Sequence, residues 1–274
     1  MKKIKVSPAR KLFNICNVVV ITLIMLICLV PILNVLAQSF SSSHAIVQNK
    51  VRLFPVEFTT SAYSYVMKNK DFWQAALVSA ERVLLGVPIN MLLTVLAAYP
   101  LSKSDRVFKA RKYYSAYFVF LMIFNGGLIP TYYVISKLGL IDTIWALVLP
   151  CGVPIFNVIL MMNFFRGIPE SLEESAMLEG AGQWTIMSKI YLPLSKPSIA
   201  TVTLFSLINH WNSWFDGLIL MNNPDNYPLQ TYIQTIAVQR SFSMMTREEI
   251  QQMATISDRT LRSAQIFLGS LPIV

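Results

Sequence analysis

Residues 13–36 read FNICNVVVITLIMLICLVPILNVL, a run of 24 residues without a charge. An α-helix rises about 1.5 Å per residue, so this run can cross a hydrocarbon core of about 30 Å. Five basic residues precede it: Lys2, Lys3, Lys5, Arg10 and Lys11. Because basic flanks stay in the cytoplasm, the pattern predicts a membrane span with a cytoplasmic N-terminus. A secretory signal peptide is the alternative, but 24 apolar residues exceed its usual length.

The whole chain has the composition of a membrane protein. Of its 274 residues, 54% are hydrophobic and 14% are charged, whereas soluble domains carry about 25% charged residues. We predict an all-α membrane protein that forms one domain over residues 1–274. Its six spans are expected at about 13–36, 75–98, 114–135, 142–165, 197–220 and 261–274. The sixth is incomplete at the C-terminus, because the 12 residues 263–274 are too few to cross a membrane.

Charged residues orient these spans. The net charge is +9, and a short loop after the second span carries five basic residues and one acid, at positions 103–112. This loop is therefore expected in the cytoplasm, as is the segment 166–196. Loops 37–74 and 221–260 then lie outside. Three cysteines (Cys16, Cys28 and Cys151) fall within predicted spans, which argues against a disulfide framework or a metal cluster.

Two predicted spans contain unusual residues. Glu81 and Arg82 lie in the second span, where facing lipid would cost several kcal/mol, so they are expected to face the bundle interior or a partner. The third span is interrupted by Asn125, Gly126, Gly127 and Pro130. Such breaks are tolerated against neighbouring helices or a water-lined path, so we expect this span to face protein.

Function is easiest to read in the cytoplasmic segment 166–197, RGIPESLEESAMLEGAGQWTIMSKIYLPLSKP. Pro169 suits the first position of a helix, and the glutamates that follow favour the positive end of its dipole. Gly180 and Gly182 can take the positive φ values that turn a chain. Trp184, Met187 and Tyr191 then recur at helical spacing and predict a second amphipathic helix that ends at Pro193.

The expected product is a helix-turn-helix with an acidic first arm at the inner membrane face. A DNA-binding helix-turn-helix needs basic residues in its second arm. Here the second arm offers only Lys189, so nucleic-acid binding is not expected.

The same segment carries a long gapped motif. Glu174-Ser175-Ala176 is followed after three residues by Gly180 and after nine more by Ile190, Tyr191, Leu192 and Pro193. In this spacing the chain resembles the integral membrane subunits of binding-protein-dependent ABC importers, whose loop reads Glu-Ala-Ala, Gly, then Ile-x-Leu-Pro. It departs from the family at Ser175 and at Glu179, where Ala and Asp are usual. Residues 97–102, 126–130 and 210–215 resemble the maltose-transporter-like carbohydrate permeases, especially those that import complex oligosaccharides in Gram-positive bacteria.

The resemblance implies a multi-pass type I ABC importer transmembrane domain in a bacterial plasma membrane. It implies as partners a second permease, two cytoplasmic ATPases, an extracellular solute-binding lipoprotein and a sugar or oligosaccharide. None of the ten glycines is followed by Lys, so the chain has no Walker motif, and ATP and Mg are expected on the partner ATPase. The residues expected to couple to that ATPase are Glu173, Glu174, Ser175, Ala176, Glu179, Gly180, Ala181, Ile190, Leu192 and Pro193.

Sugar sites usually combine aromatic faces with amide and hydroxyl donors, and comparable groups lie at the outer end of the fifth span. These candidates for the substrate path are His210, Trp211, Asn212, Trp214 and Asp216. Asn125 is a second candidate. A membrane-interface belt of aromatic residues explains the first group almost equally well, and the partner permease could hold the whole sugar site. The rival function is a secondary transporter driven by an ion gradient, although only Glu81 and Arg82 lie deep in a span. A membrane enzyme is disfavoured because no catalytic motif accompanies His44 and His210.

Overall fold

A computed structural model describes residues 7–239, 258–270 and 272. The described residues are helical or irregular apart from one isolated antiparallel bridge between Ser41 and Phe58. The chain divides into two compact units. The terminal unit comprises Met1–Lys70 and Ala237–Val274, and the central unit comprises Asp71–Ile236.

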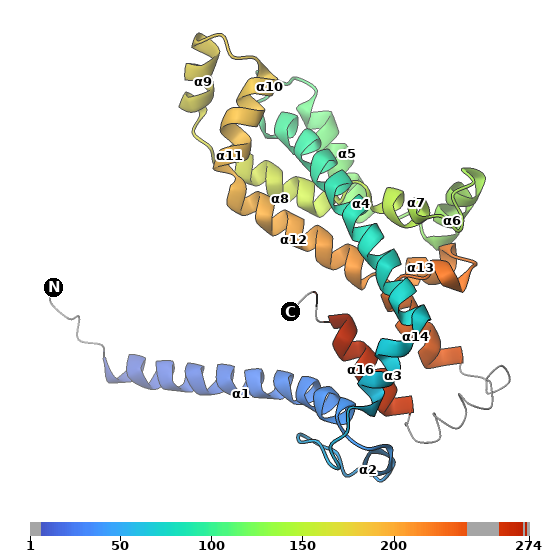
Figure 1. The fold of residues 1–274 in the computed structure, drawn as a ribbon. Helices are drawn as coiled ribbons and strands as arrows, with labels where there is room; N and C mark the ends of the chain where they lie inside the picture. The colour runs from blue at the N-terminus through green and yellow to red at the C-terminus, as the bar shows by residue number, and fades with distance from the viewer. Residues whose placement is uncertain (1–6, 240–257, 271, 273–274) are drawn as a thin grey trace. The chain divides into compact units, whose positions relative to one another are not determined.

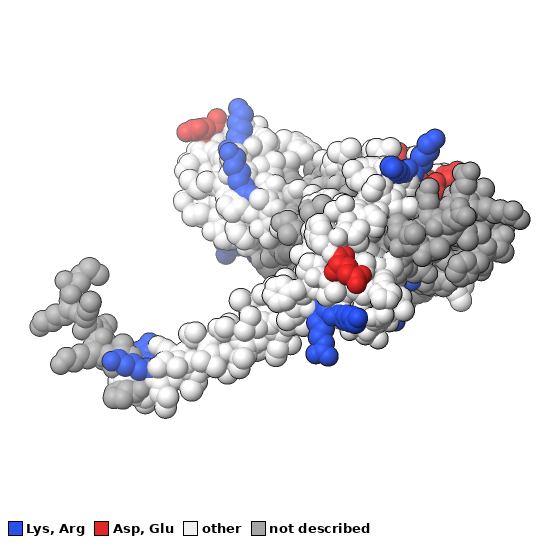
Figure 2. Space-filling model, turned by 60° about the horizontal axis from the view of Figure 1, so that its bottom comes forward, with Lys and Arg blue, Asp and Glu red and all other residues white. Residues whose placement is uncertain are grey.

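The terminal unit contains α1 (Pro8–Ser39), α2 (Ser43–Val47), α3 (Ser61–Lys68) and α16 (Asp258–Ser270). Ser7 caps α1 by accepting a hydrogen bond from the Arg10 amide. The apolar side chains of α1 are exposed over most of its length, and Figure 2 shows an uncharged surface there with basic residues at its beginning. α16 packs against α1 and α3. The predicted first span lies entirely within α1. The beginning of the predicted sixth span lies within α16.

In the central unit, α4 (Lys70–Ser102) runs along the whole length of the unit (Figure 1). Its buried face is a stripe of small and polar residues at intervals of three or four: Ala75, Ser79, Arg82, Gly86, Asn90, Thr94 and Ala98. Small residues let neighbouring helices approach closely, and polar ones bond across the interface, as is usual between membrane helices. This helix contains the predicted second span.

The next two predicted spans are broken. Residues 114–135 are divided between α5 (Arg111–Ile123) and α6 (Leu128–Lys137), which meet at 112°. Gly127, with φ at +86°, provides the turn, whereas Pro130 lies inside α6. Residues 142–165 form α7 (Ile144–Val148), a 3-10 turn (Leu149–Cys151) and α8 (Ile155–Arg166), bent by 44°. Pro154 at the N-cap of α8 accounts for this bend, because proline cannot donate a helical hydrogen bond and disfavours helix in the residue before it.

The fifth predicted span is also broken, into α12 (Lys196–Asn212) and α13 (Phe215–Leu220). Side chains satisfy the backbone groups freed at this break: Thr231 donates to the Trp214 carbonyl at 2.7 Å, and Asp216 accepts from the Gly217 amide at 2.9 Å. Two described helices, Ala9–Ser39 and Lys70–Ser102, are each long and apolar enough to cross a membrane, and the two bent pairs raise the number to four if each pair is one span.

One end of the central unit is held together by α14 (Leu229–Gln239). The Leu229 amide donates to Ser79 Oγ of α4 at 2.7 Å. α14 also packs tightly on α13, because a Cβ at Gly217 would lie 2.9 Å from Pro228 Cδ and closer still to Thr231 Oγ1.

We expect Gly217→Ala to destabilise the protein by about 1–3 kcal/mol, since it overpacks this contact. Thermal unfolding in detergent should show a lower midpoint for Gly217→Ala. Gly126→Ala is the matched control, because nothing lies within 4 Å of a Cβ at that position. Equal midpoints for the two variants would contradict the packing of α13 on α14.

Candidate functional site

The segment that carries the long motif forms a helical pair at one end of the central unit (Figure 1). Its first arm is α9 (Glu170–Leu178), and its second comprises α10 (Gln183–Ile186), a π-helical turn (Met187–Tyr191) and α11 (Leu192–Leu194). Gly180 turns the chain between the arms with φ at +82°. Gly182 was predicted to do the same but has φ at −77°, because one left-handed residue suffices for the turn. Pro169 occupies the N-cap of α9, one residue before the predicted position.

The second arm does not end at Pro193, as the sequence predicted. The π-helical turn ends at Tyr191, and Pro193 lies in the first turn of α11, where a missing amide donor is tolerated. Helical structure continues to Leu194, and α12 begins at Lys196 after one intervening residue. The second arm therefore runs almost directly into a long helix of the core, so a displacement of this arm is passed to α12.

The first arm is fastened to the end of α4 by a buried charge cluster. Lys103 Nζ lies 2.7 Å from Glu173 Oε2, and the Tyr191 hydroxyl donates to the same oxygen at 2.7 Å. Lys103 Nζ also lies 4.1 Å and 3.9 Å from the ring centres of Tyr99 and Tyr191, within cation–π range. Lys103, Glu173 and Tyr191 are all buried. Burial lowers the pKa of Lys103, while Glu173 acts in the opposite direction, and burial raises the pKa of Tyr191.

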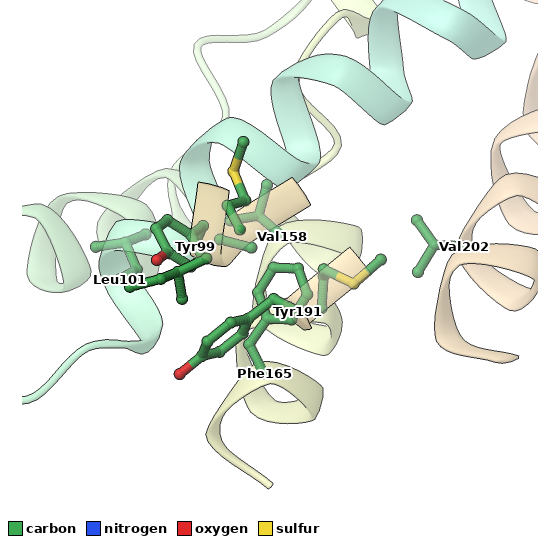
Figure 3. Close-up of a cluster of buried hydrophobic side chains, with 10 residues drawn as sticks. Tyr99, Leu101, Val158, Phe165, Tyr191 and Val202 are labelled. Atoms are coloured by element: carbon green, nitrogen blue, oxygen red, sulfur yellow. The ribbon is translucent and has the colours of Figure 1, made fainter. Parts of the chain in front are cut away.

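Aromatic packing surrounds this cluster. Figure 3 shows the side chains of Tyr99, Phe165 and Tyr191 beside one another, and their rings meet edge to face with centroids 5.1 to 6.3 Å apart. The Tyr99 hydroxyl donates to Gln183 Oε1 at 2.7 Å. Parts of α4, α8 and both arms thus share one core, so the helical pair is a rigid extension of the central unit.

The opposite face of the helical pair is exposed. Glu174, Ser175, Glu179, Gly180 and Pro193 are exposed, while Ala176, Ala181, Ile190 and Leu192 are half-buried. Two large apolar side chains of the helical pair are also exposed, Leu178 at 91% and Trp184 at 71%. The sequence had placed Trp184 on one face with Met187 and Tyr191, but those two are buried and Trp184 is not. We call Glu174, Leu178, Glu179 and Trp184 the docking patch.

A second buried cluster lies deeper in the central unit. Arg82 is fully buried and forms an ion pair with Asp216. Its guanidinium also donates to the Leu147 carbonyl at 3.3 Å and to His210 Nδ1 at 3.4 Å. His210 Nε2 lies 3.0 Å from Asn90 Oδ1. A Cβ at Gly86 would come within 2.6 Å of the His210 ring, so this glycine makes room for it.

The structure therefore places the predicted path residues in different surroundings. His210 and Asp216 both contact Arg82, as described. Asn209, which precedes His210 in α12, is exposed. Asn212 and Trp214 are exposed and Trp211 is half-buried. Asn125 is exposed between α5 and α6, where its side chain accepts from the Gly127 amide at 2.9 Å. Glu81 and Arg82 were expected to face the bundle interior or a partner; Arg82 is buried in the central unit, whereas Glu81 is exposed in this chain.

The sequence matches the family described as binding-protein-dependent transport system inner membrane component over residues 82–271. The chain belongs to this family. The permease is 34% identical to the polygalacturonan/rhamnogalacturonan transport system permease protein YtcP of Bacillus subtilis, over 97% of this chain and 92% of that protein. It is 35% identical to Protein LplC of the same organism, over 98% of this chain and 90% of that protein.

Solved structures agree with this assignment. A chain in the crystal structure of a bacterial ABC transporter involved in the import of the acidic polysaccharide alginate is 32% identical, with a TM-score of 0.89 over 99% of this chain and 96% of that chain. A second chain, from the bacterial alginate ABC transporter in complex with an alginate pentasaccharide-bound periplasmic protein, is 14% identical and shares the fold at a TM-score of 0.58. The predicted type I ABC importer fold and permease function are confirmed, and the protein is a multi-pass membrane permease.

Proposed function

We propose that this permease forms half of the translocation path of a sugar or oligosaccharide importer. A second permease forms the other half, two cytoplasmic ATPases bind and hydrolyse ATP with Mg, and an extracellular lipoprotein delivers the sugar. The named transport system of one relative handles polygalacturonan and rhamnogalacturonan, and that of the structural neighbour handles alginate. These names support a carbohydrate as the cargo. The N-terminus and the helical pair then face the cytoplasm, where the ATPases lie.

The observation that supports ATPase coupling is the docking patch on a rigid base. Leu178 and Trp184 expose large apolar side chains on the same helical pair that exposes the carboxylates of Glu174 and Glu179. Apolar anchors surrounded by charges are typical of a protein interface. The residues behind the patch are fixed by Lys103 and Glu173. A partner that pulls on the patch therefore moves α4 and α12 together with it.

This arrangement accounts for how ATP hydrolysis elsewhere can move the path in this chain. When the two ATPases close on ATP, each would draw its helical pair inward. Because the second arm continues into α12 and the first is tied to α4, the displacement would tilt these helices as one body. Rigid-body rocking of this kind opens the path to one side of the membrane and closes it to the other. Glu174 would pair with a basic residue of the ATPase.

Gly180→Val tests the coupling assignment. Only glycine readily takes φ at +82°, and a β-branched residue there would change the angle between the two arms. We expect Gly180→Val to abolish sugar uptake while the permease stays in the membrane. Gly182→Val is the matched control, because Gly182 has an extended backbone with nothing within 4 Å of a Cβ. Normal uptake by Gly180→Val would show that the turn does not couple the permease to its ATPase.

A further inference from the structure

A cavity of about 460 Å³ lies between α4, α8 and α12 in the central unit. Amide, hydroxyl and aromatic side chains line it, and we call it the amide pocket: Asn90, Phe156, Asn157, Phe205, Ser206 and Asn209. His210 closes one side, and the described residues that line the pocket include no Lys, Arg, Asp or Glu. Its volume falls within the range of small-molecule sites.

Two residues of the pocket lie far along their helices from the ends that are expected to face the cytoplasm. Asn90 precedes the end of α4 at Ser102 by 12 residues, which is about 18 Å along the helix. Asn209 follows the start of α12 at Lys196 by 13 residues, which is about 20 Å. A hydrocarbon core about 30 Å thick that begins at these helix ends would contain both residues. Polar side chains at that depth normally face protein or water and mark a substrate or ion path.

The walls of the pocket are fixed by hydrogen bonds. Asn157 Nδ2 donates to Ser206 Oγ at 3.1 Å, and Asn90 Nδ2 donates to the Cys151 carbonyl at 2.9 Å. That carbonyl stands at the break between α7 and α8, which also borders the pocket. Irregular backbone at membrane depth is tolerated where it lines a cavity, and broken helices recur at transporter substrate sites.

The mouth of the pocket offers groups that suit a sugar. Phe156 and Phe205 are 58% and 41% exposed, and their rings lie 6.3 Å apart at 47°. Asn209, which lines the same pocket, is also exposed. A sugar ring has an apolar face that packs on an aromatic ring and hydroxyls that bond to amides, so both kinds of group are supplied within one cavity.

We propose that the amide pocket is a sugar subsite of the translocation path that binds ring hydroxyls rather than a carboxylate. This inference rests on the proposed function, because it needs a sugar as the cargo. Neutral donors and acceptors without a cation match hydroxyl groups. A carboxylate of an acidic sugar would need a cation or several backbone amides, which this lining does not offer. The pocket thus recognises the part of the sugar that neutral and acidic saccharides share.

Transport kinetics test the proposal. The permease is reconstituted with its partner subunits, and uptake of an oligogalacturonide and of a neutral galacto-oligosaccharide is measured. Asn209→Leu and Phe205→Ala are each expected to raise the KM by about three- to tenfold for whichever probe is carried. ATP hydrolysis stimulated by the binding protein should persist. Leu204→Ala is the control, since Leu204 is exposed on α12 at about 140° from Asn209.

The outcomes separate this inference from the proposed function. If the wild type imports neither probe nor any other saccharide, the proposed sugar function fails and the inference with it. If the wild type imports a saccharide and both pocket variants keep its KM, the inference alone is overturned.

Thiol labelling gives an independent readout. In a chain whose native cysteines are replaced by Ser, Asn209→Cys should react with a charged, water-soluble thiol reagent, and the transported saccharide should slow that reaction at least threefold. Leu204→Cys should react in neither condition. Labelling of Asn209→Cys that the saccharide does not slow would count against a sugar subsite.

Discussion

Asp216→Leu is expected to lower the yield of folded permease to a small part of that of the wild type. Arg82 is fully buried, and of its partners Asp216 supplies the negative charge. Leaving one charge of a buried pair without its partner costs about 3–5 kcal/mol, a large part of a typical stability of about 5–15 kcal/mol. The thermal midpoint in detergent should fall by roughly 6 to 20 °C. The yield of monodisperse protein should fall with it.

A double variant separates the unpaired charge from lost packing. Arg82→Met together with Asp216→Leu removes both charges at similar volume, and replacing a whole buried ion pair by apolar residues is often neutral or stabilising. We therefore expect the double variant to recover a midpoint near that of the wild type. Equal losses in the single and double variants would attribute the effect to packing. A wild-type midpoint for Asp216→Leu would show that Arg82 does not depend on this partner.

The extents of the first two spans and the break in the third, at Gly126 and Gly127, could be predicted from the sequence, but the break in the fifth could not. Residues 13–36 and 75–98 lie within α1 and α4, because long apolar runs favour a continuous helix even with Pro31 and Pro88 inside it. The break at Ser213 has no comparable signal in the chain. It depends on Thr231 and Asp216, which satisfy the freed backbone groups. Such tertiary hydrogen bonds are invisible to a local pattern.

The candidate site shows the same division. The turn at Gly180 follows from the motif spacing, and an interior role for Arg82 follows from its position in a span. Its partner Asp216 lies 134 residues away, and two isolated opposite charges in separate spans were the signal that could have joined them. The roles of Glu173 and Glu174 could not be told apart in the sequence, because both suit the first turns of an acidic helix. Their difference arises from Lys103, a residue far along the chain that reaches only Glu173.

Because Glu173 and Glu174 differ in this way, substitutions at these adjacent positions test the two roles against each other. Glu174 is exposed on the docking patch, whereas Glu173 is buried against Lys103. Glu173→Gln is expected to lower the thermal midpoint of the permease itself, since it removes the charge that compensates Lys103. Glu174→Lys should leave that midpoint unchanged, because the Glu174 side chain is exposed and contributes no ion pair to the described part of the permease. The thermal midpoint of each purified permease, measured without ATPase, distinguishes the two roles.

Association with the ATPase should show the reverse order, with Glu174→Lys as the stronger change. If Glu174 forms a partly desolvated pair with a basic residue of the ATPase, reversing its charge should cost about 3–5 kcal/mol. Each 1.4 kcal/mol is about tenfold, so association should weaken by roughly two to four powers of ten. A fully solvated pair would lose about 1 kcal/mol or less, and the complex would survive purification. The control is Glu170→Lys, an exposed glutamate in the first turn of the same helix that lies outside the docking patch. Equal recovery of ATPase with wild type and with Glu174→Lys would transfer the anchoring role to Glu179, because Glu173 is already committed to Lys103 inside the permease.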